Sequence, residues 1–116
     1  MLRDPDSEAP WVPRADVFKN TAGEFTIKVE LAGLSREDIQ LGIEGRGVRI
    51  TGHRHDTDRS AACNRYVAPA INWGWFDLVV DVPAEFDLSR ARAHYQNGLL
   101  RVLVPQRSEG RPARKA

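Results

Sequence analysis

The residues best suited to metal chemistry lie together in one short stretch. His53 and His55 are followed by two acids, Asp56 and Asp58, and by the only cysteine of the chain, Cys63. On a strand, His-x-His spacing places both imidazoles on one face, and imidazole nitrogen is a preferred ligand of Zn²⁺. No second pair of residues completes a four-ligand site, and short motifs of this kind match by chance. We interpret the stretch as a solvated loop and expect no metal or other cofactor.

Other reactive chemistry has little support in the sequence. No Ser-His-Asp arrangement, phosphate-binding glycine loop or paired-carboxylate motif stands out, so we expect no catalytic residue and no enzyme. Cys63 lies in a polar stretch and is interpreted as an inert thiol, with an oxidative link between two dimers as the alternative. His94 alternates outward on a strand-like segment, and we interpret it as a surface or groove histidine.

Composition excludes several classes of partner. The chain has 116 residues, of which 41% are hydrophobic, and this suits one domain with a modest core. Its formal net charge is +1, and Glu109 interrupts the basic residues near the C-terminus, so neither a nucleic acid nor a membrane partner is expected. No apolar run approaches the ~20 residues of a membrane span. The first ten residues carry no secretory signal, and we expect a cytoplasmic protein.

Strands are the elements that must position any site. Strict alternation of apolar and polar residues, the pattern of a strand with one buried face, recurs in several segments. These segments are 25–31, 39–43, 48–51, 76–82 and 91–95. No stretch keeps helical spacing for the ten or more residues of a packed helix. The pattern predicts an all-β antiparallel sandwich over residues 11–106, between a disordered segment at 1–10 and a flexible tail at 107–116.

The connections and the last strand support this interpretation. Asn97-Gly98 predicts a two-residue hairpin, residues 44–47 predict a second hairpin, and Ser35 with Asp38 predicts a capped helical turn. The segment 99–104 is apolar on both faces, with Leu99 and Leu103 on one of them. A strand of this kind needs cover on its outer face as well, from a partner subunit, from the tail of the chain or from another bound protein.

Several motifs, taken in order, resemble those of one family. They are P-x-x-D-V at 13–17, L-x-G-L-x-x-x-D-I at 31–39, I-x-G-x-R at 50–54, GWFDLVVDVP at 74–83 and A-x-x-x-N-G-L-L at 93–100. The series is similar to the alpha-crystallin domain of bacterial small heat-shock proteins and covers about residues 11–106. The resemblance implies an immunoglobulin-like antiparallel β-sandwich of seven to nine strands.

The resemblance also implies a function without covalent chemistry or ATP. Proteins of this family act as holdase chaperones, which bind partly unfolded clients through apolar edge grooves and prevent their aggregation. Carried over to this chain, the groove places four residues nearby: Leu41, Ile43, Ala93 and Tyr95. The alternative is an adaptor similar to the CS-domain co-chaperones, which binds one folded partner. The A-x-x-x-N-G-L-L motif favours the holdase.

Self-association is the last implication of the resemblance. The family uses the place of residues 53–73 for a loop whose small strand crosses to the partner subunit; a simple flexible loop is the alternative. The candidate interface residues are Tyr66, Val67, Ala68, Ile71, Trp73 and Trp75. The family arginine and glutamate of one salt bridge, which bear on the geometry of the dimer, are replaced here by Leu78 and Ala70. Members that build large shells carry an Ile-x-Ile-type tail motif and a long apolar N-terminal arm, whereas here no Ile, Leu or Val follows Pro105 and few apolar residues precede Trp11. We therefore expect a homodimer or small homo-oligomer rather than a large shell.

Overall fold

A computed structural model describes residues 9–58, 67–68 and 70–108 of the protein. These described residues form seven strands. The strands are β1 (Ala15–Lys19), β2 (Phe25–Glu30), β3 (Ile39–Glu44), β4 (Gly47–Arg54), β5 (Gly74–Asp81), β6 (Arg92–Gln96) and β7 (Leu99–Val104). Two single turns of 3-10 helix, η1 (Arg36–Asp38) and η2 (Leu88–Arg90), complete the described elements. The part of the chain that the structure describes contains no α-helix, as the sequence pattern predicts.

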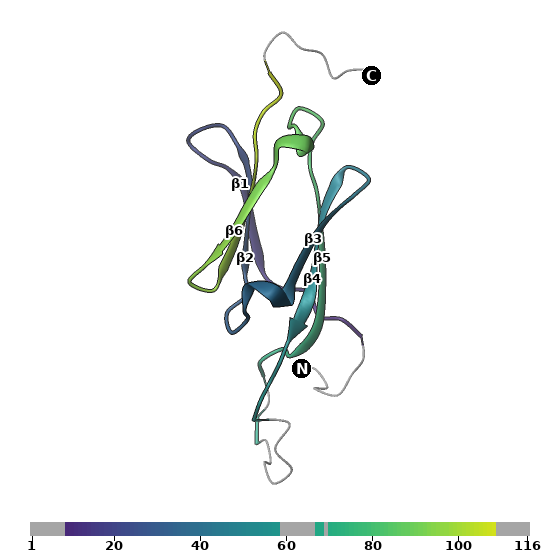
Figure 1. Ribbon diagram of the computed structural model, residues 1–116, viewed down its shortest axis with the longest axis vertical. Coiled ribbons are helices and arrows are strands. Elements are labelled where there is room, and N and C mark those ends of the chain that lie inside the picture. Colours follow the sequence, from purple (N-terminus) through teal and green to yellow (C-terminus); the bar gives the residue numbers. More distant parts are fainter. Residues whose placement is uncertain (1–8, 59–66, 69, 109–116) are drawn as a thin grey trace.

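The strands form two antiparallel sheets that face each other. One sheet has the order β1-β2-β7-β6 and the other has the order β3-β4-β5. Figure 1 shows them as two layers, with β1, β2 and β6 on one side and β3, β4 and β5 on the other. This arrangement confirms the predicted antiparallel sandwich.

The core lies between the two layers and consists of the inward residues of the alternating strands. Among them Ile27, Val29, Ile50 and Val104 are fully buried, and Phe76 is 2% exposed. Burial of such side chains contributes about 1.5–3 kcal/mol each to folding. The period-two pattern of the sequence therefore identifies the inner face of each sheet correctly.

The predicted turns are present. Asn97 and Gly98 both have positive φ, at 55° and 76°, as a two-residue turn between β6 and β7 requires. Residues 45–46 connect β3 to β4 where Glu44 pairs with Gly47. The Asp38 carboxylate accepts hydrogen bonds from the backbone N–H and the hydroxyl of Ser35, each at 3.1 Å, which confirms the capped turn at η1.

Strand β4 is longer than predicted, and β1 has no counterpart among the alternating segments. The prediction for β4 ended at Thr51, whereas β4 continues to Arg54. Gly52 and Arg54 take the inward positions there, and neither residue reads as apolar in a sequence pattern. All residues of β1 are exposed, so burial imposes no alternation on that strand.

Strand β7 receives the cover of its outer face in part from its own sheet. Leu103 pairs with Thr26 on β2 and with Arg92 on β6, and Leu99 lies between Glu30 and Gln96. Both leucines are half-buried. Polar neighbours on the same face of the sheet thus flank both leucines, in line with their intermediate exposure.

Candidate functional site

A groove runs between β3 and β6, the edge strands of the two different sheets. The inner-face residues of β3 include Leu41 and Ile43, since each pairs with a buried residue of β4. Those of β6 include Ala93 and Tyr95, which pair with buried residues of β7. The structure therefore brings together all four residues that the sequence analysis placed at a groove.

The groove consists of two adjoining hollows. The first has a volume of about 340 Å³ and includes Leu41, Ile43 and Ala93 in its lining. The second, of about 300 Å³, is lined in part by Leu41, Ala93 and Tyr95. Because Leu41 and Ala93 border both hollows, one continuous groove follows the two strand edges.

The floor of the groove is apolar and its walls are unusually exposed. Val48 and Val102, which lie in the first hollow, are each only 3% exposed. By contrast, Leu41 is 45% exposed and Ile43 is 58% exposed. Two large aliphatic side chains on the inner face of a sheet are thus left without cover, and covering them would release free energy.

Tyr95 has a fixed position at the second hollow. Its hydroxyl donates hydrogen bonds to the carbonyl oxygens of Leu31 and Leu34, the latter at 3.2 Å. A buried tyrosine hydroxyl normally requires such partners. Tyr95 was expected at the groove from the sequence, whereas no sequence signal indicates this anchor in the segment between β2 and η1.

Basic residues border the groove on both sides. Arg36 and His94 contribute to the second hollow, and Arg92 contributes to the first. Arg92 forms an ion pair with Glu24 at 2.8 Å, and hydrogen bonding to Arg92 lowers the pKa of the Glu24 carboxyl. The groove therefore combines an apolar floor with a polar, mainly basic border, and it suits binding rather than covalent chemistry.

The predicted interface residues of the 53–73 region are mostly solvent-exposed where the structure describes them. Val67 is 99% exposed, Ile71 is 61% exposed and Trp75 is 63% exposed. Ala68 is exposed as well, whereas Trp73 is half-buried and lies beside the guanidinium of Arg54 at 5.3 Å. Tyr66 lies outside the described residues. The structure does not join these residues to the groove.

Strand β1 presents a further exposed apolar surface that the sequence analysis did not identify. Val17 is 47% exposed and Phe18 is 39% exposed, although they lie on opposite faces of the strand. Their neighbour on the sheet is β2 alone, because β1 is the last strand of its sheet. The unpaired edge of β1 and both of its faces are therefore accessible.

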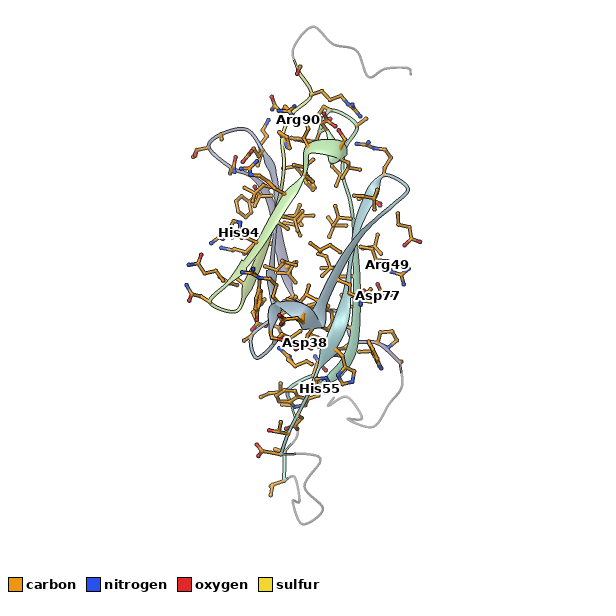
Figure 2. All side chains as sticks on the ribbon, viewed as in Figure 1. Asp38, Arg49, His55, Asp77, Arg90 and His94 are labelled. Atoms are coloured by element: carbon orange, nitrogen blue, oxygen red, sulfur yellow. The ribbon has the colours of Figure 1, made fainter. Side chains whose placement is uncertain are left out.

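The metal-ligand stretch of the sequence is described only in part. His53 and His55 lie at the end of β4 with ring centroids 4.2 Å apart, while Cys63 lies outside the described residues. Within residues 9–58, 67–68 and 70–108, no group of three or more His, Cys, Asp or Glu side chains is placed to hold a metal ion. His94 lies on the outer side of the other layer, as Figure 2 shows.

Comparison with known proteins gives a consistent family assignment. A family model described as the Hsp20/alpha crystallin family matches residues 17–116. The chain is 24% identical over 105 residues to small heat shock protein C2 of Rickettsia felis, covering 90% of this chain and 67% of that protein. It is 29% identical over 104 residues to spore protein SP21 of Stigmatella aurantiaca, covering 90% of this chain and 60% of that protein. The chain thus spans 60–67% of the length of these two relatives.

Solved structures show the same fold. A small heat-shock protein from Xylella fastidiosa superposes with a TM-score of 0.77 at 24% identity, covering 93% of this chain and 97% of that chain. The hspA protein from Xanthomonas axonopodis gives a TM-score of 0.74 at 24% identity, covering 85% and 97%. These likenesses confirm the predicted alpha-crystallin sandwich. No helix among the described residues has the length and apolar character that crossing a bilayer requires.

Proposed function

Because the chain belongs to the Hsp20/alpha-crystallin family, we propose that it is an ATP-independent holdase chaperone that binds partly unfolded clients in the β3–β6 groove. The observation that carries this proposal is the exposure of Leu41 and Ile43 above an apolar floor. Unfolded chains expose apolar side chains that folded proteins bury, so such a surface selects them without sequence specificity.

The proposed mechanism is mass action. A protein that binds unfolded chains lowers the concentration of the species that aggregates. The affinity of one groove can be low, since two grooves in one assembly engage a single client at two points and strengthen its binding. No covalent step and no cofactor is needed.

The test is suppression of heat-induced aggregation of citrate synthase, followed by light scattering. We expect Ile43→Ser to weaken protection by about tenfold, because it removes an apolar contact worth roughly 1.5 kcal/mol. The matched control is Val79→Ser, since Val79 is 49% exposed but lies on the outer face of β5. Equal protection by the two variants would show that the groove is not the client site.

The parent chain provides the more general test. Absence of protection at a several-fold molar excess of the unaltered chain would contradict the holdase function itself. It would favour the adaptor, in which the same sandwich binds one folded partner. A pull-down of a single stoichiometric folded protein would then identify that partner.

We also propose that the chain forms homodimers through two exposed apolar surfaces, the described part of residues 67–75 and strand β1. The support is the exposure of Ile71, Trp75, Val17 and Phe18, together with the unpaired edge of β1. An extended segment can add to such an edge through main-chain hydrogen bonds. Deletion of residues 57–70 should give monomers in multi-angle light scattering. A dimer that persists after the deletion would show that this segment does not pair with the partner subunit.

A further inference from the structure

His53 and His55 form a side-chain pair on the face of the β3-β4-β5 sheet opposite the core. Their ring centroids lie 4.2 Å apart at an interplanar angle of 44°. On its other side His53 contacts Trp75, its partner in the β4–β5 register, at 4.7 Å between centroids and in an edge-to-face arrangement. Neighbours along and across the sheet therefore restrict the position of the His53 ring.

The hydrogen-bonding capacity of His53 is not fully used. Its Nδ1 atom is buried and has no hydrogen-bond partner among the described residues. Buried polar atoms of this kind are rare in folded proteins, and each one calls for an explanation such as a bound ion. Burial, the largest cause, and the nearby His55 lower the pKa of His53, while Asp38 acts in the opposite direction.

A negative charge lies beside the pair. Asp38 precedes β3 and is the residue next to the Ile39–Gly52 register pair, so it lies across from His53. Figure 2 shows Asp38 and His55 at the same end of the molecule. Hydrogen bonds from Ser35 are the main cause that lowers the pKa of Asp38, and the charges of His55 and His53 lower it further. This charge attracts a cation to the pair.

We propose that His53 and His55 together bind one late first-row divalent metal ion, Cu²⁺ or Ni²⁺, with water in the remaining coordination positions. When two imidazoles bind one ion with an N–metal–N angle of 90° and metal–nitrogen distances of about 2.0 Å, their ring centroids lie roughly 4.5 Å apart. The observed separation of 4.2 Å is close to this value. Imidazole ligands suit these ions, and the affinity of a given site for first-row divalent ions rises through Ni²⁺ to a maximum at Cu²⁺. This proposal differs from the expectation, drawn from the sequence, that the His-x-His stretch is a solvated loop, and the experiment below decides between them.

The experiment is a CuCl₂ titration of the full chain, prepared without a histidine tag and with Cys63→Ser to remove the thiol. Cu²⁺ quenches indole fluorescence at short range, so Trp75 reports occupancy directly. We expect quenching that saturates at one equivalent. The variant His53→Asn/His55→Asn should weaken the apparent affinity by more than about tenfold, since loss of a hydrogen-bond partner of a ligand alone typically costs that much.

His94→Asn is the matched control, because it removes the third of the three histidines, which lies on the other sheet. It should leave the titration unchanged. Trp75→Phe should reduce the amplitude of quenching while the affinity for NiCl₂, measured by calorimetry, stays the same. Circular dichroism verifies that each variant is folded; if the double variant is not, His55→Asn alone, at an exposed position, serves the same purpose.

Two results would overturn the proposal. One is an unchanged affinity in the folded double or single histidine variant. The other is the absence of saturable Cu²⁺ binding in the Cys63→Ser chain when the unaltered chain binds, which would assign the ion to the thiol.

Discussion

Arg49 holds two acidic side chains on the outer face of the β3-β4-β5 sheet. Its Nε donates to Asp77 at 3.0 Å and its Nη1 donates to Glu44 at 3.1 Å; Figure 2 shows Arg49 and Asp77 on the outer side of their layer. The hydrogen bonds from Arg49 lower the pKa of the Asp77 carboxyl. A carboxyl with a lowered folded pKa stabilises the fold above its unfolded pKa of about 3.9, and this contribution is lost as the pH falls through the folded value.

The variant Asp77→Asn should therefore unfold more readily than the parent at pH 7, and the difference should shrink below about pH 4. The pair is partly exposed, so the effect at pH 7 is small and decreases further in high salt. Urea unfolding at both pH values measures it. Asp81→Asn makes the same charge change further along the same face of β5, and an equal loss in that variant would contradict a specific role for Arg49.

Gly52 is the residue of β4 whose replacement we expect to be most damaging. A Cβ atom at this position would collide with the carbonyl oxygen of Asp38 and would lie 2.5 Å from Cζ of Phe76. Overpacking of this kind costs about 1–3 kcal/mol. Gly52→Ala should lower the free energy of unfolding in urea by that amount, whereas Gly42→Ala, with open space around its Cβ position, should change it by less than about 0.5 kcal/mol.

At the scale of the element, the β6–β7 hairpin depends on Gly98. Its φ is 76°, and an added Cβ would lie 3.2 Å from Cα of Ala32, in the segment after β2. Gly98→Ala should cost about 1–2 kcal/mol from the left-handed backbone alone. Gly45→Ala, at φ 62° with open space around it, isolates that backbone cost. A larger loss for Gly98 in thermal unfolding would measure the contact with Ala32; equal losses would exclude it.

The strands that the sequence predicts are those with one buried face. Burial on the core side selects apolar residues at every second position, and the pattern in Ile27, Val29 and Leu31 follows directly. Strand β1 carries no such signal because neither of its faces is buried. The position of Trp11 in the core, at 5% exposure, was also not predictable, since one buried residue creates no period.

The groove was predictable in its membership but not in its shape. Alternation alone places Leu41 with Ile43, and Ala93 with Tyr95, because each pair shares a face of one strand. Strands β3 and β6 border one another because the two sheets pack face to face. No local sequence pattern encodes that packing. The family resemblance supplied that information, whereas the hydrogen bonds of Tyr95 required coordinates.

At the scale of the whole molecule, Trp11 attaches the N-terminal part of the described chain to the sandwich. The backbone N–H of Trp11 donates to the carbonyl oxygen of Trp75, and the carbonyl oxygen of Trp11 accepts from the N–H of Asp77. The indole Nε1 of Trp11 donates to the carbonyl oxygen of Gly74 at 3.1 Å. The Arg54 guanidinium lies 4.5 Å from its ring. Trp11 therefore covers part of the free edge of β5 as well as filling the core.

Trp11→Ala should lower the free energy of unfolding by about 3–5 kcal/mol, the range for loss of a large buried aromatic side chain. Val12→Ala is the control, because Val12 is adjacent in sequence but 64% exposed. Chemical denaturation monitored by circular dichroism distinguishes the two. Similar midpoints for both variants would show that Trp11 is dispensable for the sandwich.

The two walls of the β3–β6 groove belong to separate sheets, and no ladder of main-chain hydrogen bonds joins β3 to β6. A small rocking of one layer relative to the other changes the aperture of the groove while every strand pairing stays intact. The aperture of the groove is therefore set by side-chain packing between the layers and not by strand pairing.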